Sequence, residues 1–171
     1  MAIFEIALRG PNEQARVGVQ ISIQVEVRNV SQQPAWIVGV IDGSEEGIRY
    51  PHYLPEVWRA GQMVADLPVP EDPLVGPLRM EDFRLLAPGE TFDPTVRSGG
   101  AAYLPISTFR NFFPLKAGVY QFSLTLSTES QSTEQWLGRF RQDIDRAAVL
   151  ERIALIPRQT VRSNVLEVEV A

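Results

Sequence analysis

Three stretches of strict alternation constrain the fold of this chain more than any other feature. From Val17 to Val27 every odd position is aliphatic, and every even position from Gly18 to Arg28 is polar or glycine. The same period of two returns over 118–126 and 164–170. This period places alternate side chains on opposite faces of a strand, one on a core and one in solvent, whereas a helix would scatter them round its axis. The pattern predicts an all-β protein.

Shorter apolar runs predict further strands. Residues 3–8 form a first short strand with Ile3 or Phe4 facing inward, and residues 36–41 form a strand that is apolar on both faces and therefore central. Additional strands are expected at 62–67, at 80–86 and from 92 onward. Turn residues such as Pro, Gly, Asn and Ser separate these runs. Together they predict a β-sandwich of about seven strands.

One segment has helical spacing. Ser132 and Gln135 have the spacing of a capping box, and an apolar stripe follows them. The stripe consists of Leu137, Phe140, Ile144 and Ala147 or Ala148. We expect one helix from about Thr133 to Ala154, inserted before the last strand. It either covers an open part of the sandwich or docks on a partner, including a second copy of the chain.

Composition excludes several classes of protein. The chain has 171 residues, no cysteine and one histidine, so disulfide scaffolds, thiol chemistry and two-histidine sites are excluded. Its net charge of −5 argues against nucleic acid and against an anionic membrane surface as partners. The first residues lack a signal-peptide pattern, which favours the cytoplasm and leaves a trimmed exported protein as the alternative.

The middle of the chain differs from the rest. Residues 40–100 carry eleven acidic and five basic side chains, and ten of the thirteen prolines lie between Pro51 and Pro114. Residues 42–77 resist assignment to regular structure. We interpret them as a long Pro-rich acidic insertion within a single domain that spans residues 1–171.

This segment holds the candidate binding residues. They are Tyr50, His52, Tyr53, Trp58 and Arg59. Aromatic side chains on loops at the end of a sandwich can bind a peptide or a glycan. The alternative is that these aromatics fix the long loop to the sheet.

Asp42, Glu45 and Glu46 form the densest acidic turn and are the candidate metal ligands. Their oxygen atoms could hold calcium, although the spacing is not that of an EF-hand loop. The alternative is an exposed hairpin turn, in which Asp42-Gly43 is common.

Catalytic patterns are missing from the sequence. His52 is the only histidine, and no nucleophile elbow or glycine-rich phosphate loop occurs. We therefore expect a protein that is not an enzyme and needs no cofactor. A small hydrolase that uses two carboxylates is an alternative.

Other aromatic residues are expected in the interior. Phe109, Phe112 and Phe113 are predicted to be buried where the chain crosses the end of the sandwich. Trp36 is predicted in the core, and Trp136 under the helix.

The segment Leu115-Lys116-Ala117-Gly118-Val119-Tyr120 resembles the entry to the penultimate strand of immunoglobulin-like and fibronectin III sandwiches. That resemblance implies a tyrosine corner, in which the Tyr120 hydroxyl bonds to upstream backbone. The spacing of this segment from 29–31 and 86–90 is similar to bacterial immunoglobulin-like domains, among them intracellular proteinase inhibitors of the BsuPI type. We therefore expect an immunoglobulin-like binding or protein-interaction module, with proteinase inhibition as the alternative.

Overall fold

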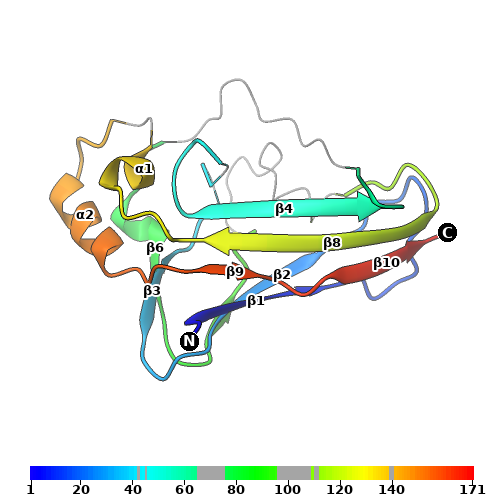
Figure 1. Ribbon diagram of the computed structural model, residues 1–171, viewed down its shortest axis with the longest axis horizontal. Coiled ribbons are helices and arrows are strands. Elements are labelled where there is room, and N and C mark those ends of the chain that lie inside the picture. The colour runs from blue at the N-terminus through cyan, green and yellow to red at the C-terminus, as the bar shows by residue number, and fades with distance from the viewer. Residues whose placement is uncertain (42, 45, 65–75, 96–108, 110–111, 139–140) are drawn as a thin grey trace.

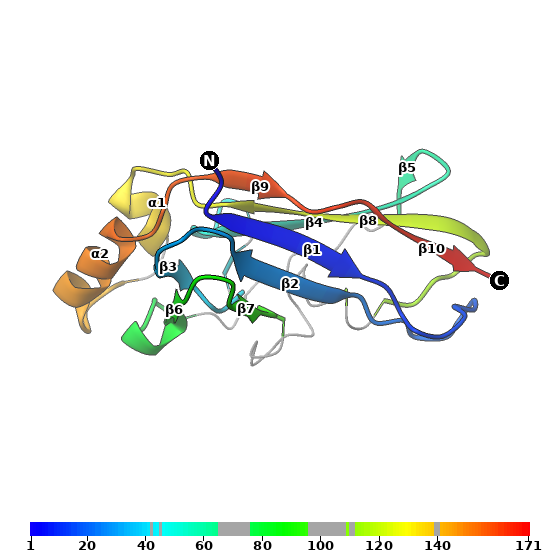
Figure 2. The same ribbon diagram turned by 90° about the horizontal axis from the view of Figure 1, so that it is seen from below.

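The computed structural model is an all-β sandwich, as the alternation predicts (Figures 1 and 2). It describes all residues except 42, 45, 65–75, 96–108, 110–111 and 139–140. The smaller sheet has the order β1 (Phe4–Arg9), β2 (Gln24–Asn29), β7 (Thr91–Phe92). The larger has the order β10 (Leu166–Val170), β8 (Gly118–Ser127), β4 (His52–Arg59), β5 (Gln62–Met63), and β9 (Thr160–Arg162) also pairs with β8. A third pair joins β3 (Ala35–Val38) to β6 (Phe83–Leu86).

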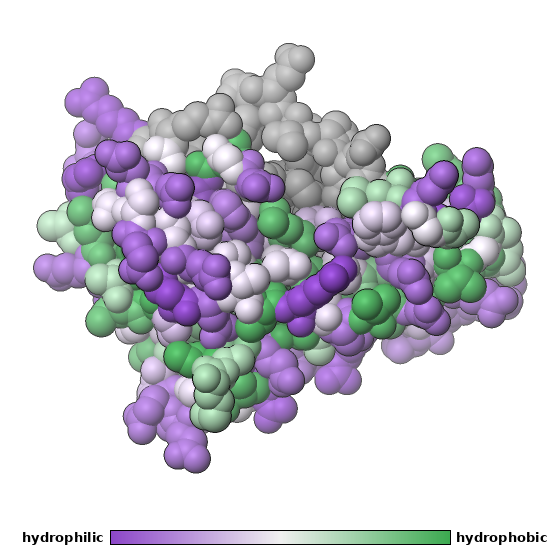
Figure 3. Space-filling model, viewed as in Figure 1, coloured by the Kyte–Doolittle hydropathy of each residue, from purple (hydrophilic) through white to green (hydrophobic). Residues whose placement is uncertain are grey.

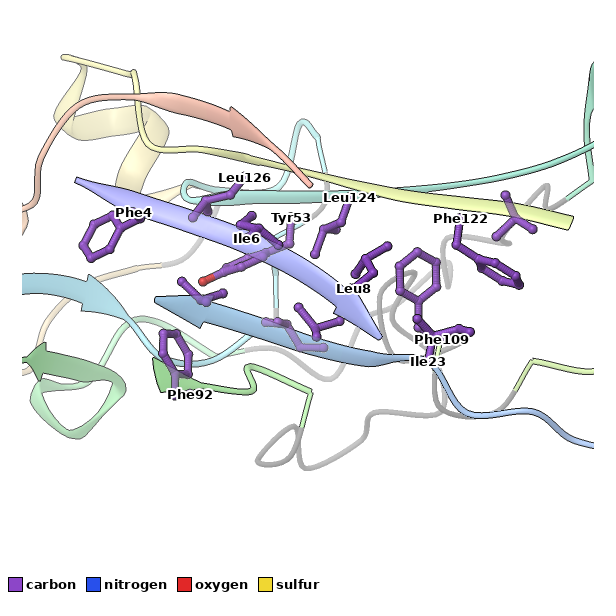
Figure 4. Close-up of a cluster of buried hydrophobic side chains, with 14 of the residues drawn as sticks. Phe4, Ile6, Leu8, Ile23, Tyr53, Phe92, Phe109, Phe122, Leu124 and Leu126 are labelled. Atoms are coloured by element: carbon purple, nitrogen blue, oxygen red, sulfur yellow. The ribbon is translucent and has the colours of Figure 1, made fainter. Parts of the chain in front are cut away.

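Alternating side chains of the two larger sheets fill the main core (Figure 4). Phe4 of β1 and Phe122 of β8 have no exposed surface. The prediction that Ile3 or Phe4 faces inward is therefore confirmed for Phe4. β8 and β10 lie within the two predicted strands at 118–126 and 164–170 or differ by one residue.

The strand in the alternating stretch from Val17 to Arg28 is shorter than the pattern predicts. Only Gln24–Asn29 pairs in a sheet, and Val17 and Val19 are 42% and 53% exposed. The reason is that the chain leaves the sheet before residue 24, and Ile21 makes only an isolated bridge to Phe112. Alternation therefore predicted the strand itself, but neither its first paired residue nor the exposure of Val17 and Val19.

The predicted helix over 133–154 is wrong as a single element. The described residues of this segment form two helices, α1 (Thr133–Leu137) and α2 (Arg146–Ala154). The predicted cap is present, because the Ser132 hydroxyl accepts from the Gln135 amide at 3.4 Å. Gly138 ends α1 with a φ of 65°, and a Cβ there would lie 2.2 Å from the carbonyl oxygen of Ile48. Only glycine fits this close approach.

The helices cover a second, smaller hydrophobic cluster beside β3 and β6 (Figure 1). Trp136 is fully buried there and donates from Nε1 to the Ser130 carbonyl at 2.8 Å, which confirms its predicted place under helical structure. The prediction of a central strand at 36–41 is wrong, because among the described strands β3 (Ala35–Val38) pairs with β6 alone. Trp36 is half-buried in this second cluster, and the Arg152 guanidinium lies 3.7 Å from its ring centroid.

The segment 42–77 is not an insertion throughout, because it contains β4. This strand pairs along its full length with β8 in the larger sheet. Pro55 is tolerated in β4 because the N–H that it lacks would point away from β8. The hydrogen bonds of Tyr53 and Val57, which share the same edge of the strand, show this direction. Tyr53 donates to the Ser44 carbonyl, and Val57 accepts from Val64, both on the side away from β8. A proline at such an edge position removes no hydrogen bond from the β4–β8 ladder.

The expected hydrogen bond of Tyr120 is present. Its hydroxyl donates to the Lys116 carbonyl at 2.9 Å, and its ring is 3% exposed. This bond fixes the turn that leads into β8. Among the described residues, no helix combines the length and the apolar character that a membrane crossing requires.

Candidate binding surfaces at the two ends of strand β4

Strand β4 separates the predicted binding residues instead of bringing them together. His52 is its first residue and Arg59 its last. At about 3.3 Å per residue, His52 and Trp58 lie about 20 Å apart. Tyr50 and His52 therefore belong to the end of the molecule that carries the helices, and Trp58 and Arg59 to the opposite end (Figure 1).

Tyr53 belongs to the main core and to neither end. It is 1% exposed, and its hydroxyl donates to the Val38 carbonyl at 3.4 Å. Burial raises its pKa well above the ordinary range, so the phenol stays neutral. Its predicted role in binding is wrong, because a buried phenol cannot contact a partner.

Tyr50 and His52 line a cavity of about 260 Å³ between β4 and α1. Their rings stack with centroids 3.9 Å apart, and Tyr50 also lies 5.8 Å from the Trp136 ring. The other lining residues are Gly47, Ile48, Arg49, Glu134, Gln135 and Gly138. Both rings are half-buried, so the aromatics here mainly fix the chain to the helical end.

The cavity favours the neutral form of His52. Burial lowers its pKa, and the charge of Glu46 opposes that shift. A neutral imidazole stacked on a phenol is a packing element whose charge changes only in acid.

At the other end of β4, Trp58 and Arg59 are held by neighbouring strands and turns. Trp58 donates from Nε1 to Glu56 at 3.1 Å, and Arg162 donates to the same carboxylate oxygen at 2.9 Å. Arg59 donates from Nε to the Ala117 carbonyl at 3.3 Å. Both side chains are half-buried.

Aliphatic and aromatic side chains are exposed around these two residues, and we name this surface the apolar end. It consists of Val17, Val19, Met63, Val64, Phe113, Leu115 and Val119. Met63 pairs with Trp58, and the Gly18 amide donates to the Pro114 carbonyl at 2.9 Å. Exposure reaches 81% at Leu115. Figure 3 shows hydrophobic side chains among polar ones at this end of the molecule.

The sequence prediction missed this surface. Phe109 is fully buried and Phe112 partly buried, as predicted, but Phe113 is 52% exposed, so its predicted burial is wrong. The reason is that Phe112 points at Tyr120 and Phe122, and its neighbour is then directed outward. The available signal was the presence of Phe113, Leu115 and Val119 beside the turn residues Pro114 and Gly118.

The predicted calcium site lies mostly outside the described residues. Asp42 and Glu45 are not described, and Glu46 is exposed. In the described part of the chain, no three His, Asp or Glu side chains gather as metal ligands would.

Comparison of the chain with protein-family models, curated proteins and solved structures finds no match.

Proposed function

We propose that this protein is a non-enzymatic, immunoglobulin-like module that binds another protein through its apolar end. The supporting observation is the cluster of exposed apolar side chains at that end, with Leu115 81% and Phe113 52% exposed. Exposed apolar side chains that gather on one part of a folded domain are typical of a protein-interaction site.

Hydrogen bonds from neighbouring side chains fix the backbone of the apolar end at residues 116 and 117. The Tyr120 hydroxyl donates a hydrogen bond to the Lys116 carbonyl, and Arg59 donates one to the Ala117 carbonyl. These two bonds fix the turn that presents Leu115. A surface that is already ordered loses less entropy when it binds.

Charge indicates the chemistry of the partner. Two exposed cationic residues, Arg16 and Lys116, adjoin the apolar side chains Val17 and Leu115, and Glu169 lies opposite Val119. The partner that fits is an apolar patch with mainly acidic residues at its rim. A second copy fits less well, because a two-fold contact would oppose the same cations.

The test is affinity capture with matched variants of the full chain. We expect Phe113→Ser with Leu115→Ser to abolish retention of the partner that the unchanged protein captures. The control, Ile144→Ser with Leu155→Ser, alters equally exposed side chains near α2 and should retain it. Loss of the partner with the control pair alone would contradict the proposal and favour docking through the helices.

Proteinase inhibition is a second candidate function, favoured by the loop at 113–117 that carries Leu115. Residues 113–117 lack regular secondary structure, and Leu115 is 81% exposed. An inhibitor presents such a segment to the active site of a protease. Titration of a panel of proteases tests this: inhibition that Leu115→Gly removes would support it, and no inhibition would exclude it.

A further inference from the structure

A second cavity at the helical end lies between α1 and α2, which are neighbours in space (Figures 1 and 2). Its volume is about 280 Å³, just below the roughly 300–1,000 Å³ of most small-molecule sites. Its lining includes the polar residues Gln131, Thr133 and Arg158, and the apolar residues Leu150 and Ile153 of α2. A cavity of this size and lining can hold a small ligand that is polar at one end and apolar at the other.

Two backbone carbonyls and one aromatic ring fix the guanidinium of Arg158. Its Nη1 donates to the Ile153 carbonyl at 3.1 Å and to the Ile156 carbonyl at 2.8 Å, at the C-terminal end of α2. Its central carbon lies 4.7 Å from the centroid of the Trp136 ring, which is a cation–π contact. The Trp136 indole is itself fixed, because it donates to the Ser130 carbonyl. The cation is therefore held in one place before any ligand binds.

The other two nitrogens of this guanidinium have no hydrogen-bond partner among the described residues. Nε of Arg158 is buried, whereas Nη2 remains accessible. In the described part of the chain, no carboxylate lies within ion-pair distance of Arg158. Burial lowers the pKa of the group, so its charge is partly removed from water. Because buried charges in proteins are normally paired, this arrangement favours an anion beside Nη2.

The anion that fits this cavity carries a single charge. Among the described residues that line it, Arg158 alone is charged. Two exposed carboxylates, Glu134 and Glu151, follow the lining residues Thr133 and Leu150 in sequence. A doubly charged phosphate would be repelled by such neighbours, whereas one carboxylate balances the one guanidinium.

We propose that this cavity binds a small organic monocarboxylate with a short apolar chain. The carboxylate accepts from Nη2 of Arg158 and from the Thr133 hydroxyl, and the apolar chain packs on Leu150 and Ile153. One ion pair at a partly exposed position, with a short chain, predicts weak binding with a Kd of about 1 mM. The site is independent of the apolar end, which lies at the other end of β4.

The test is an NMR titration of the full-length protein with sodium hexanoate as the probe. We expect a saturable shift of the Trp136 indole N–H resonance, while that of Trp58, at the other end of β4, stays unchanged. 1-Hexanol has a similar chain without the charge and should bind at least about tenfold more weakly, since a charge-assisted hydrogen bond is lost. Sodium acetate and sodium phosphate at matched ionic strength supply an anion without the chain. Each should also bind at least about tenfold more weakly than hexanoate.

Three variants complete the test. Arg158→Gln should weaken hexanoate binding at least about tenfold. The control is Arg146→Gln, which removes an exposed arginine of α2 outside the lining and should leave binding unchanged. Because Arg158→Gln also removes contacts at the end of α2, Ala154→Phe is a second test that leaves Arg158 in place. Ala154 is exposed and lines the cavity, so the larger side chain should block hexanoate and leave the fold intact.

A Trp136 resonance that hexanoate does not shift would overturn the proposal. Equal binding of hexanoate and 1-hexanol would overturn it as well, and so would equal or tighter binding of acetate or phosphate. Unchanged hexanoate binding by Arg158→Gln or by Ala154→Phe would also contradict it. Phe113→Ser with Leu115→Ser should not alter this titration, so failure here and failure of the proposed partner surface are distinguishable.

Discussion

The two ends of the molecule carry similar apolar and aromatic residues, but these are largely enclosed at one end and exposed at the other. At the helical end, α1 and α2 enclose Trp136 and half-bury Tyr50 and His52. At the apolar end, no helix formed by the described residues covers the chain, and Phe113 and Leu115 are exposed. Apolar content alone therefore does not predict an exposed apolar surface. What decides the exposure is whether another element of the chain packs on those side chains.

The largest effect is expected at the helical end, from Gly138→Ala. The new Cβ would meet the Ile48 carbonyl at 2.2 Å and occupy a positive φ. Thermal or urea unfolding should show a loss of about 3 kcal/mol or more. The control is Gly61→Ala, which has a similar φ of 75° but open space around it and should cost about 1 kcal/mol. Equal losses in the two variants would show that α1 does not pack closely on the 48–49 backbone.

A smaller effect is expected at the apolar end, from Tyr120→Phe. The variant removes the hydroxyl that donates to the Lys116 carbonyl and should cost about 1 kcal/mol. Tyr50→Phe is the control, because the structure gives its hydroxyl no hydrogen bond in the described part of the chain, and its cost should stay under about 0.5 kcal/mol. The reverse order of the two losses in urea unfolding would refute this account of the turn.

Leu115→Ser should change stability by less than about 0.5 kcal/mol, because the side chain is already 81% exposed. Leu137→Ala at the helical end removes a side chain that is 5% exposed and should cost about 3 kcal/mol. The contrast is measured by unfolding both variants in urea. A Leu115 variant as unstable as the Leu137 variant would mean that the apolar end is covered in the folded chain.

The smallest effect concerns pH and His52. Because burial lowers its pKa in the folded state, the unfolded state takes up a proton first as the pH falls below about 6.5. The stability contributed by the neutral ring is therefore complete above that pH and declines below it until the folded state also protonates. His52→Gln should flatten the melting temperature against pH in this window. A variant with the same slope as the unchanged protein would exclude His52 as the cause.

Much of the fold could be predicted from local patterns. Period-two alternation identified the strands at 24–29, 118–127 and 166–170, because each has one buried face, and a short apolar run identified the strand at 4–9. The Leu115–Tyr120 motif predicted the hydroxyl contact of Tyr120. These features depend on residues that are close in sequence, or on burial, which the pattern of apolar and polar residues indicates.

Other features could not be predicted, because they depend on distant contacts. β4 carries prolines, and its place follows from which of its edges faces β8. Gly138 ends α1 because the Ile48 carbonyl lies against it, about ninety residues away in sequence. The prediction that Tyr50, His52, Tyr53, Trp58 and Arg59 form one site was wrong. Residues that are near in sequence lie far apart in an extended strand, and β4 places His52 and Arg59 at its two ends.

The most direct test of the apolar end as the contact surface is amide hydrogen exchange on the protein with and without its captured partner. The account predicts slower exchange at 112–120 and at 62–64 in the complex, with 133–137 and 146–154 unchanged. Slower exchange confined to the two helices would contradict it and assign the contact to the helical end.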